Sequence, residues 1–256
     1  MQHAWLEQAL ALTDVSWQPV LRRGLAAVVA ADADYLERLG EDVYLPTNHR
    51  LFAAFAQPLD EVRYVLVGEG PYPREASATG VCFMDGAVDA LWSPAGLSKQ
   101  VNRATSLRNF MKMLMVADGL LKPESTTGEA VASVAQHALK ANSQLIQTLP
   151  ELQQNLHATG FLLLNAALVF RPHVPPLKEA RAWRPLLAVV LEALAGRPGQ
   201  QAPTLVLWGK IAAWLEELLA VSHLPKAVAE HPYNLSFIRN RDMQQLFGPM
   251  RLLARD

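Results

Sequence analysis

Short apolar stretches along the chain alternate with segments of helical periodicity. The first strand-like stretch is Arg63–Gly68, and similar ones occur at Phe161–Asn165, Leu205–Trp208 and Ala227–Ala229. Strands that alternate with helices usually form a parallel sheet with helices on both faces. The pattern therefore predicts an α/β protein with three α/β/α layers around a central four-stranded parallel sheet.

Helical spacing is clearest before the first strand and between the later ones. Apolar residues from Gln2 to about Leu39 predict two N-terminal helices. Further helices are expected around Leu107–Leu114, from about Ser143 to His157, near Lys178–Leu194 and over Ile211–Val221. Because no repeat or linker interrupts the pattern, residues 1–256 are expected to form a single domain, with residues 1–60 packed on it as a helical cap.

Composition restricts the classes of function. The chain has 23 Lys and Arg residues and 24 Asp and Glu residues, so its composition does not indicate a basic surface for nucleic acid. Cys82 is the single cysteine, which excludes an intramolecular disulfide and a cysteine-based metal site and fits a reducing cytoplasm. No signal peptide or membrane-spanning apolar run is visible. The sequence predicts a cytoplasmic protein without a membrane partner, and a monomer is expected.

The loop after the first strand reads Gly68-Glu69-Gly70-Pro71-Tyr72-Pro73, and Gly80-Val81-Cys82-Phe83 follows it. Glycine lets a ligand approach the backbone closely, while Pro71 stiffens the turn that carries Tyr72. Tyr72 and the flat face of Phe83 could sandwich a planar ring. The alternative is a loop whose aromatic side chains only fill the core.

Two further polar side chains follow predicted strands. Asn165 offers a donor and an acceptor that match one edge of a pyrimidine such as uracil, although a single asparagine is more often a turn or cap residue. His231 can donate a hydrogen bond to charge that develops on a leaving group, although alone it would be read as a structural histidine. Parallel strands bring such residues to the carboxyl edge of the sheet, where these folds bind ligands.

Taken in order, the motifs resemble those of the uracil-DNA glycosylases. Gly68–Pro73 is similar to the family's Gly-Gln-Asp-Pro-Tyr-His motif, and Gly80–Phe83 to the segment that carries its uracil-stacking phenylalanine. The later matches, in the family's order, are Ser106–Asn109, Leu162–Asn165, Leu205–Gly209 and His231–Ser236. The resemblance implies a DNA repair hydrolase that flips uracil, or a related modified base, out of DNA and cleaves its glycosidic bond without metal or organic cofactor.

The resemblance also assigns roles to residues. It implies that Tyr72 excludes the 5-methyl group of thymine, that Phe83 stacks on uracil and that Asn165 hydrogen-bonds the pairing edge of the base. His231 would stabilise the departing uracil anion. Gly68 and Gly70 would belong to the substrate-binding loop that approaches the base.

Contacts with DNA are implied at three more positions. Leu235 falls where the family inserts a leucine into the vacancy that the flipped nucleotide leaves. Ser106 and Ser236 would touch phosphates. Hydroxyl contacts of this kind hold DNA without many basic residues, so the near-neutral composition is compatible with DNA binding.

Departures from the family pattern are concentrated in the first motif. Glu69 replaces glutamine, Gly70 replaces the aspartate that positions water, and Pro73 replaces histidine. Loss of a positioned base typically costs on the order of 10²- to 10⁴-fold in rate, so weakened activity is expected. A related branch of the superfamily carries Gly-Glu-Ala-Pro here. Glu69 would then either orient water or point away and accept backbone hydrogen bonds.

Other departures affect the DNA-contacting loops and the cofactor. Arg103-Ala104-Thr105 replaces the expected prolines, and Tyr233-Asn234 replaces Ser-Pro after His231 and Pro232. The branch with Gly-Glu-Ala-Pro usually carries an iron–sulfur cluster on four cysteines, which Cys82 alone cannot supply.

Two alternatives to an active glycosylase remain at this point. The first, motivated by Gly70, is a catalytically inactive homologue that binds DNA or a partner protein. The second is a generic α/β hydrolase-like domain with accidental motif matches, although no nucleophile elbow, Walker loop or metal-ligand spacing supports it.

Overall fold

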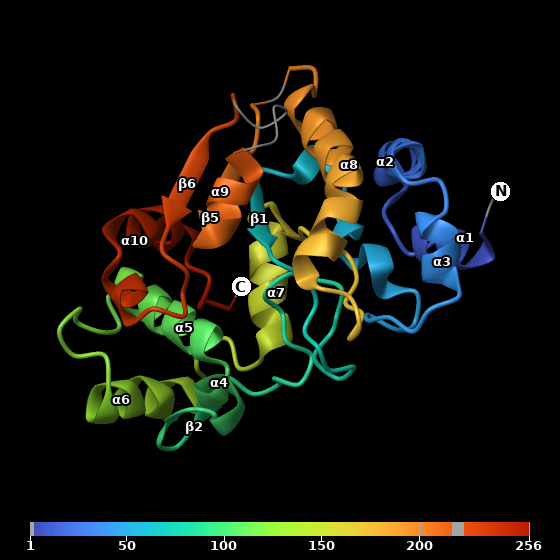
Figure 1. The fold of residues 1–256 in the computed structure, drawn as a ribbon. Coiled ribbons are helices and arrows are strands. Elements are labelled where there is room, and N and C mark those ends of the chain that lie inside the picture. Colours follow the sequence, from blue (N-terminus) through green and yellow to red (C-terminus); the bar gives the residue numbers. More distant parts are fainter. Residues whose placement is uncertain (1–2, 200, 217–222, 256) are drawn as a thin grey trace. The chain divides into compact units, whose positions relative to one another are not determined.

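The computed structural model describes residues 3–199, 201–216 and 223–255. The longer helices are α1 (Ala4–Leu10), α2 (Gln18–Ala31), α3 (Tyr35–Gly40), α4 (Lys99–Arg103), α5 (Thr105–Ala117), α6 (Gly128–Ala138), α7 (Leu149–Ala158), α8 (Pro176–Ala195), α9 (Lys210–Glu216) and α10 (Arg241–Phe247). The strands are β1 (Tyr64–Gly68), β2 (Trp92–Ser93), β3 (Gly96–Leu97), β4 (Phe161–Asn165), β5 (Thr204–Trp208) and β6 (Lys226–Ala229). Figure 1 shows their arrangement.

The central sheet has the strand order β4-β1-β5-β6. Strand β1 pairs in parallel with β4 on one side and β5 on the other. All five residues of β4 are buried, as are the three central residues of β1. Such continuous apolar runs are typical of parallel strands that are covered on both faces. The predicted α/β fold, with a four-stranded parallel sheet and surrounding helices, is confirmed.

The described chain divides into two compact units. The first comprises Met1–Gly86, Gly160–Leu207 and Ile211–Lys226, and the second Ala87–Thr159, Trp208–Lys210 and Ala227–Asp256. The single domain with a cap over residues 1–60 stays a prediction.

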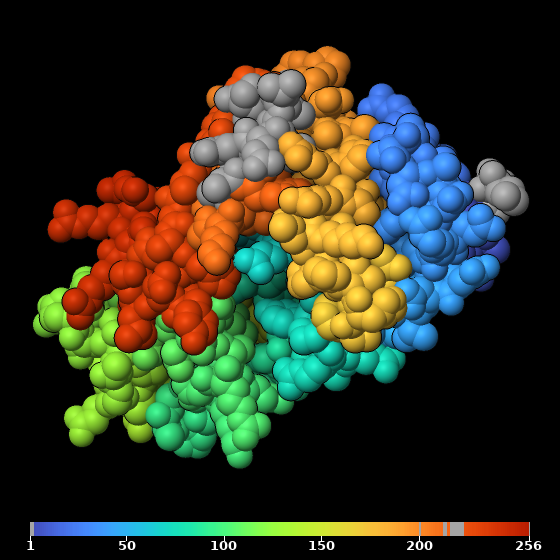
Figure 2. Space-filling view, viewed as in Figure 1, coloured from blue at the N-terminus to red at the C-terminus, as the bar shows by residue number. Residues whose placement is uncertain are grey.

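Helices α2 and α8 pack against each other in the first unit. A Cβ atom added at Gly24 of α2 would lie only 2.8 Å from Leu186 Cγ of α8, so glycine permits this close approach. The N-terminal segment abuts the yellow and orange residues of α8 in the space-filling view (Figure 2). Deeper in this contact, Tyr35 of α3 meets Trp183 of α8 edge to face, with ring centroids 5.7 Å apart.

An aromatic cluster forms the centre of the second unit. Trp208 lies 5.6 Å from Phe110 of α5 and 5.3 Å from Phe237, measured between ring centroids. Phe237 belongs to a short 3₁₀ helix, η5 (Leu235–Arg239). Helix α5 is therefore packed against the segment that follows His231, which positions the predicted DNA-contacting loop.

The helices α4 and α6 and the strands β2 and β3 were not predicted, and three predicted helical regions differ in detail. The N-terminal region contains three α-helices instead of two, because the chain is extended at Asp32 and breaks the helical run. The helix predicted from Ser143 begins at Leu149, where Thr148 and Glu151 form a capping box. The end of the helix predicted over Ile211–Val221 lies outside the described residues.

Candidate functional site

The carboxyl ends of β1 and β4 bring two predicted site segments together. Gly68 and Asn165 are register partners in the parallel ladder. Beyond them, the Ala166 N–H donates to the Gly68 carbonyl at 2.8 Å, and the Ala167 N–H donates to the Glu69 carbonyl at 3.0 Å. These bonds extend the pairing past the strands and fix the loop after β1 against the exit of β4.

Gly68 is in tight contact with two neighbouring side chains. A Cβ atom there would lie 2.4 Å from Cys82 Sγ and 3.2 Å from Asn165 Oδ1. Cys82 is itself held by its N–H, which donates to the Leu163 carbonyl at 3.0 Å. The absence of a side chain at Gly68 therefore lets the Asn165 amide and the Cys82 thiol pack at the end of the sheet.

The protein environment keeps two ionisable groups near Gly68 neutral. Burial raises the pKa of the Cys82 thiol to about 12, which leaves it protonated and unsuited to act as a nucleophile. Burial, with smaller contributions from Cys82 and Asp85, raises the pKa of the Tyr72 phenol well above its usual range. The Tyr72 phenol is therefore neutral, and its role as a wall against the base stays a prediction.

Phe83 adopts a strained backbone conformation. Its φ of 67° lies in the left-handed region, which costs a non-glycine residue of order 1–3 kcal/mol. The Thr79 hydroxyl braces this turn by donating to the Met84 carbonyl at 2.8 Å, and an antiparallel bridge between Ala78 and Asp85 closes the loop. The surrounding loop thus holds the strained backbone at Phe83 in place.

Glu69 and Gly70 are both exposed to solvent. A Cβ atom added at Gly70 would meet Ala167 Cβ at 3.4 Å, an ordinary van der Waals distance, so this position has room for a side chain. Gly70 is therefore not required by packing, in contrast to Gly68.

In the second unit, His231 begins a tight turn. The Asn234 N–H donates to the His231 carbonyl at 2.9 Å, with Pro232 and Tyr233 at the two corners. From α5, the fully buried Asn109 donates through Nδ2 to the Pro232 carbonyl at 2.7 Å. Asn109 thus anchors the turn that carries His231.

The turn also orients the His231 imidazole. The Tyr233 N–H donates to His231 Nδ1 at 3.1 Å. Because Nδ1 accepts this bond, the neutral ring carries its proton on Nε2. Gly209 lies close to the base of the His231 side chain, since a Cβ there would be 2.9 Å from His231 Cβ. The result is a fixed imidazole whose Nε2–H can act as a donor.

The residues predicted to contact DNA also lie in the second unit. Ser106 is half-buried in the first turn of α5, while Ser236 and Leu235 are exposed, the latter by 69%. Leu235 and Ser236 line a groove of about 340 Å³, together with residues that include Lys112 and Arg239.

The structure brings the predicted site residues together in two groups. The first unit holds Gly68, Glu69, Gly70, Tyr72, Phe83 and Asn165, and the second holds Ser106, His231, Leu235 and Ser236. Sequence reasoning missed the supporting roles of Thr79 and Asn109. For Asn109 a signal was present, because a polar amide on the apolar face of a helix needs a buried partner.

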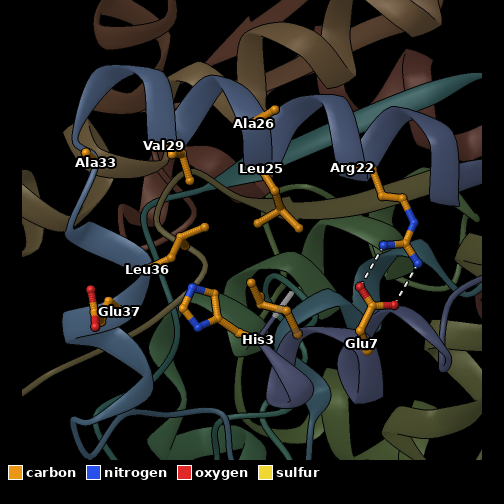
Figure 3. Close-up of a pocket in the computed structure, with 10 residues that line it drawn as sticks. His3, Glu7, Arg22, Leu25, Ala26, Val29, Ala33, Leu36 and Glu37 are labelled. Atoms are coloured by element: carbon orange, nitrogen blue, oxygen red, sulfur yellow. Dashed lines mark hydrogen bonds and ion pairs between the residues drawn. The ribbon is translucent and has the colours of Figure 1, made fainter. Parts of the chain in front are cut away.

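A separate cavity of about 310 Å³ lies among α1, α2 and α3 (Figure 3). Leu25 and Leu36 contribute apolar walls, and Arg22 forms two 2.7 Å hydrogen bonds with Glu7 at its rim. None of the predicted site residues lines it. Across the described ranges, no cluster of three or more His, Cys, Asp or Glu residues has the geometry to hold a metal ion.

The fold and these side chains define a class of protein: an α/β protein with a parallel sheet, in which the amide of Asn165 and the imidazole of His231 follow strand ends. No family model matches the chain. The crystal structure of wild-type UNG from Nitratifractor salsuginis is similar to it over 100% of both chains, with 40% identity and a TM-score of 0.88.

Curated proteins give the same result. Uracil-DNA glycosylase 1 of Streptomyces avermitilis is 29% identical, with 88% of this chain and 83% of that protein covered. The uracil-DNA glycosylase of Mycolicibacterium smegmatis is 26% identical, with 86% and 84% covered. The chain belongs to the uracil-DNA glycosylase family.

Within residues 3–199, 201–216 and 223–255, no helix combines the length and the apolar character that a bilayer crossing requires.

Proposed function

We propose that this protein excises uracil from DNA by flipping the nucleotide out of the helix and hydrolysing its N-glycosidic bond. The observation that carries the proposal is the packing of the Asn165 amide against Gly68, in the loop cluster that also holds Tyr72 and Phe83. The amide supplies a donor and an acceptor for the pairing edge of uracil. Family membership supports the same substrate.

Recognition of the base is divided among three side chains in this proposal. Phe83 stacks on the ring, and the strained turn that carries it supports a fixed ring orientation. Tyr72 excludes the 5-methyl group of thymine, which its neutral, largely buried phenol can do by steric contact. Asn165 then distinguishes uracil from cytosine, because the two bases differ in donor and acceptor pattern.

His231 acts on the leaving group. As the C1′–N1 bond breaks, the electron pair passes to uracil, and His231 Nε2–H donates a hydrogen bond to the resulting anion. The 3.1 Å contact from the Tyr233 N–H to Nδ1 supports this role, because it leaves the proton on Nε2. A donor that is already oriented stabilises developing charge without reorganisation.

Water completes the reaction by adding to C1′ and losing a proton. We propose that the Glu69 carboxylate, which is exposed, receives that proton, because Gly70 offers no side chain for the task. A carboxylate on the preceding residue aligns the water less directly, so the rate is expected to be lower than with an aspartate at position 70.

The test is incubation with single- and double-stranded oligonucleotides that contain one uracil, followed by alkaline cleavage of abasic sites. We expect cleavage by the wild-type protein, and losses of roughly two orders of magnitude or more in the His231→Ala and Asn165→Ala variants. Wild-type rates in both variants would refute the assigned roles. An unchanged rate in Glu69→Gln would show that the carboxylate does not handle water.

Gly70 motivates a second candidate function, that of a catalytically inactive homologue that binds DNA or a protein. The same assay separates the two functions. Oligonucleotide binding without cleavage at high protein concentration would favour the second.

We further propose that the protein is a cytoplasmic monomer. The single cysteine, which is buried and protonated, supports a reducing compartment. Light scattering would test the monomer, and a mass of twice 28.2 kDa in solution would contradict it.

A further inference from the structure

Tyr233 is an unusually placed aromatic residue. Its side chain is 67% exposed, and it is the one exposed aromatic side chain within the described part of the chain. Large aromatic side chains are normally buried, so an exposed one is informative about binding. In the family motif a serine stands at this position, so Tyr233 is a feature of this chain.

The backbone beneath Tyr233 is rigidly held. The residue occupies the outer corner of the turn closed by the 2.9 Å bond from the Asn234 N–H to the His231 carbonyl. Asn109 Nδ2 contacts the Pro232, Tyr233 and Asn234 carbonyls at 2.7, 3.3 and 3.4 Å. The carbonyl groups therefore face α5, and the Tyr233 side chain is presented to solvent from a fixed base.

Leu235, two residues further on, is also exposed, while Phe237 and Ile238 are buried. The buried pair anchors the segment, and the exposed pair of Tyr233 and Leu235 projects from it. Two exposed side chains on a fixed backbone can insert between stacked bases, as apolar wedge residues do.

The positive charge of the neighbouring groove indicates an anionic ligand. Lys112 and Arg239 line it together with the Thr127 hydroxyl, and none of its described lining residues is acidic. The Arg239 guanidinium is oriented by a 3.0 Å bond from Nε to the Pro123 carbonyl. Burial and the charge of Arg108 lower the pKa of Lys112, so an anion in the groove would relieve an existing repulsion.

We propose that Tyr233 stacks on the base next to the flipped nucleotide, beside the inserted Leu235, while the cationic groove holds the flanking phosphate. The inference rests on the proposed function, since it takes DNA as the ligand. An aromatic face stacks on any base and does not need a paired strand. Tyr233 therefore supports binding of single-stranded as well as duplex DNA.

The test measures binding of an oligonucleotide that carries a stable abasic-site analogue flanked by 2-aminopurine, whose fluorescence falls when an aromatic ring stacks on it. Tyr233→Ser should raise Kd by about 5- to 150-fold, the value of one base–aromatic stack, and should abolish the quenching. Tyr233→Phe should keep both within about twofold, because the ring remains. Leu139→Ser removes another exposed apolar side chain of the second unit and is the matched control, with no expected change.

The Tyr233→Ser variant retains the backbone N–H that contacts His231, so folding and the imidazole orientation are expected to be preserved, and thermal unfolding checks this. Quenching and Kd that are unchanged in Tyr233→Ser would overturn the inference, even if uracil excision is found. Tyr233-dependent binding without excision would instead leave the inference standing and refute the proposed function.

Discussion

Replacing Gly68 by alanine tests whether the Asn165 amide is positioned by close packing at the end of β1. The added methyl group would lie 2.4 Å from Cys82 Sγ and 3.2 Å from Asn165 Oδ1. Both neighbours are buried, Cys82 at 4% and Asn165 at 5% exposure, so neither side chain can swing into solvent. The strain must be absorbed by movement of the thiol, the amide or the strand.

Overpacking of this kind costs typically about 1–3 kcal/mol, and we expect Gly68→Ala to lower the free energy of unfolding by that amount. Displacement of the amide should also reduce kcat/KM for uracil-containing oligonucleotides by about 10- to 100-fold, since small misplacements of substrate-positioning groups have effects of this size. The double variant Gly68→Ala/Cys82→Ala removes the closest contact. In denaturant unfolding, it should be more stable, by a coupling energy of about 0.5–3 kcal/mol, than the sum of the two single substitutions predicts.

Gly70→Ala is the matched control for stability, because the same methyl group there meets only Ala167, with its Cβ at 3.4 Å. Its free energy of unfolding should be at least that of the wild type, and up to about 0.4–1 kcal/mol higher. Alanine lowers the conformational entropy of the unfolded chain, and this favours the folded state. Equal stabilities of Gly68→Ala and Gly70→Ala, with full activity in the former, would refute the packing argument.

Three further predictions follow from the described contacts. Glu179→Gln should lower stability by about 3 kcal/mol, since Glu179 pairs with the largely buried Arg171, whereas Glu7→Gln in an exposed, solvent-screened pair should have a much smaller effect; similar thermal shifts would contradict this. Burial raises the pKa of Asp118 to about 6 from 3.8, so its contribution to stability is present below pH 3.8 and lost as pH rises through 6. The free energy of unfolding of Asp118→Asn, relative to that of the wild type, should therefore rise by about 1–3 kcal/mol between pH 4 and pH 7. A difference in urea unfolding that does not change with pH would count against this prediction. Gly70→Asp adds a Cβ that makes only an ordinary van der Waals contact with Ala167, and it should raise the single-turnover rate by on the order of a hundredfold; an unchanged rate would show that water positioning is not limiting.

The four strands of the central sheet were the most predictable part of the fold, whereas the hairpin of β2 and β3 was not predicted. β4 is an uninterrupted apolar run, and its five residues are all buried, so composition alone marks it. The helices near residues 100 and 130 were not predicted. Helix α4 has only 5 residues and depends on the Ser98 cap, whose hydroxyl accepts from the Val101 N–H at 3.2 Å, while the 11-residue α6 begins without a side-chain cap. Short capped helices are stabilised by tertiary packing more than by their own periodicity.

Site residues were predictable where a motif carries them, but their supports were not. Asn165 and His231 could be named from strand ends and from the family resemblance. The left-handed φ of Phe83 and the contact from Asn109 to the Pro232 carbonyl depend on backbone geometry and on residues more than a hundred positions apart. No local pattern in the sequence encodes the φ of Phe83, and the amide of Asn109 on an apolar helix face indicates a buried partner without identifying it.

The most direct test of the account is a crystal structure of the His231→Ala protein, or of the wild type with a non-cleavable uracil nucleotide, bound to DNA. The account predicts a flipped uracil that stacks on Phe83 and hydrogen-bonds the Asn165 amide, with the wild-type His231 imidazole within hydrogen-bonding distance of the base. A uracil that stays stacked in the DNA, or that binds away from Asn165, would contradict it.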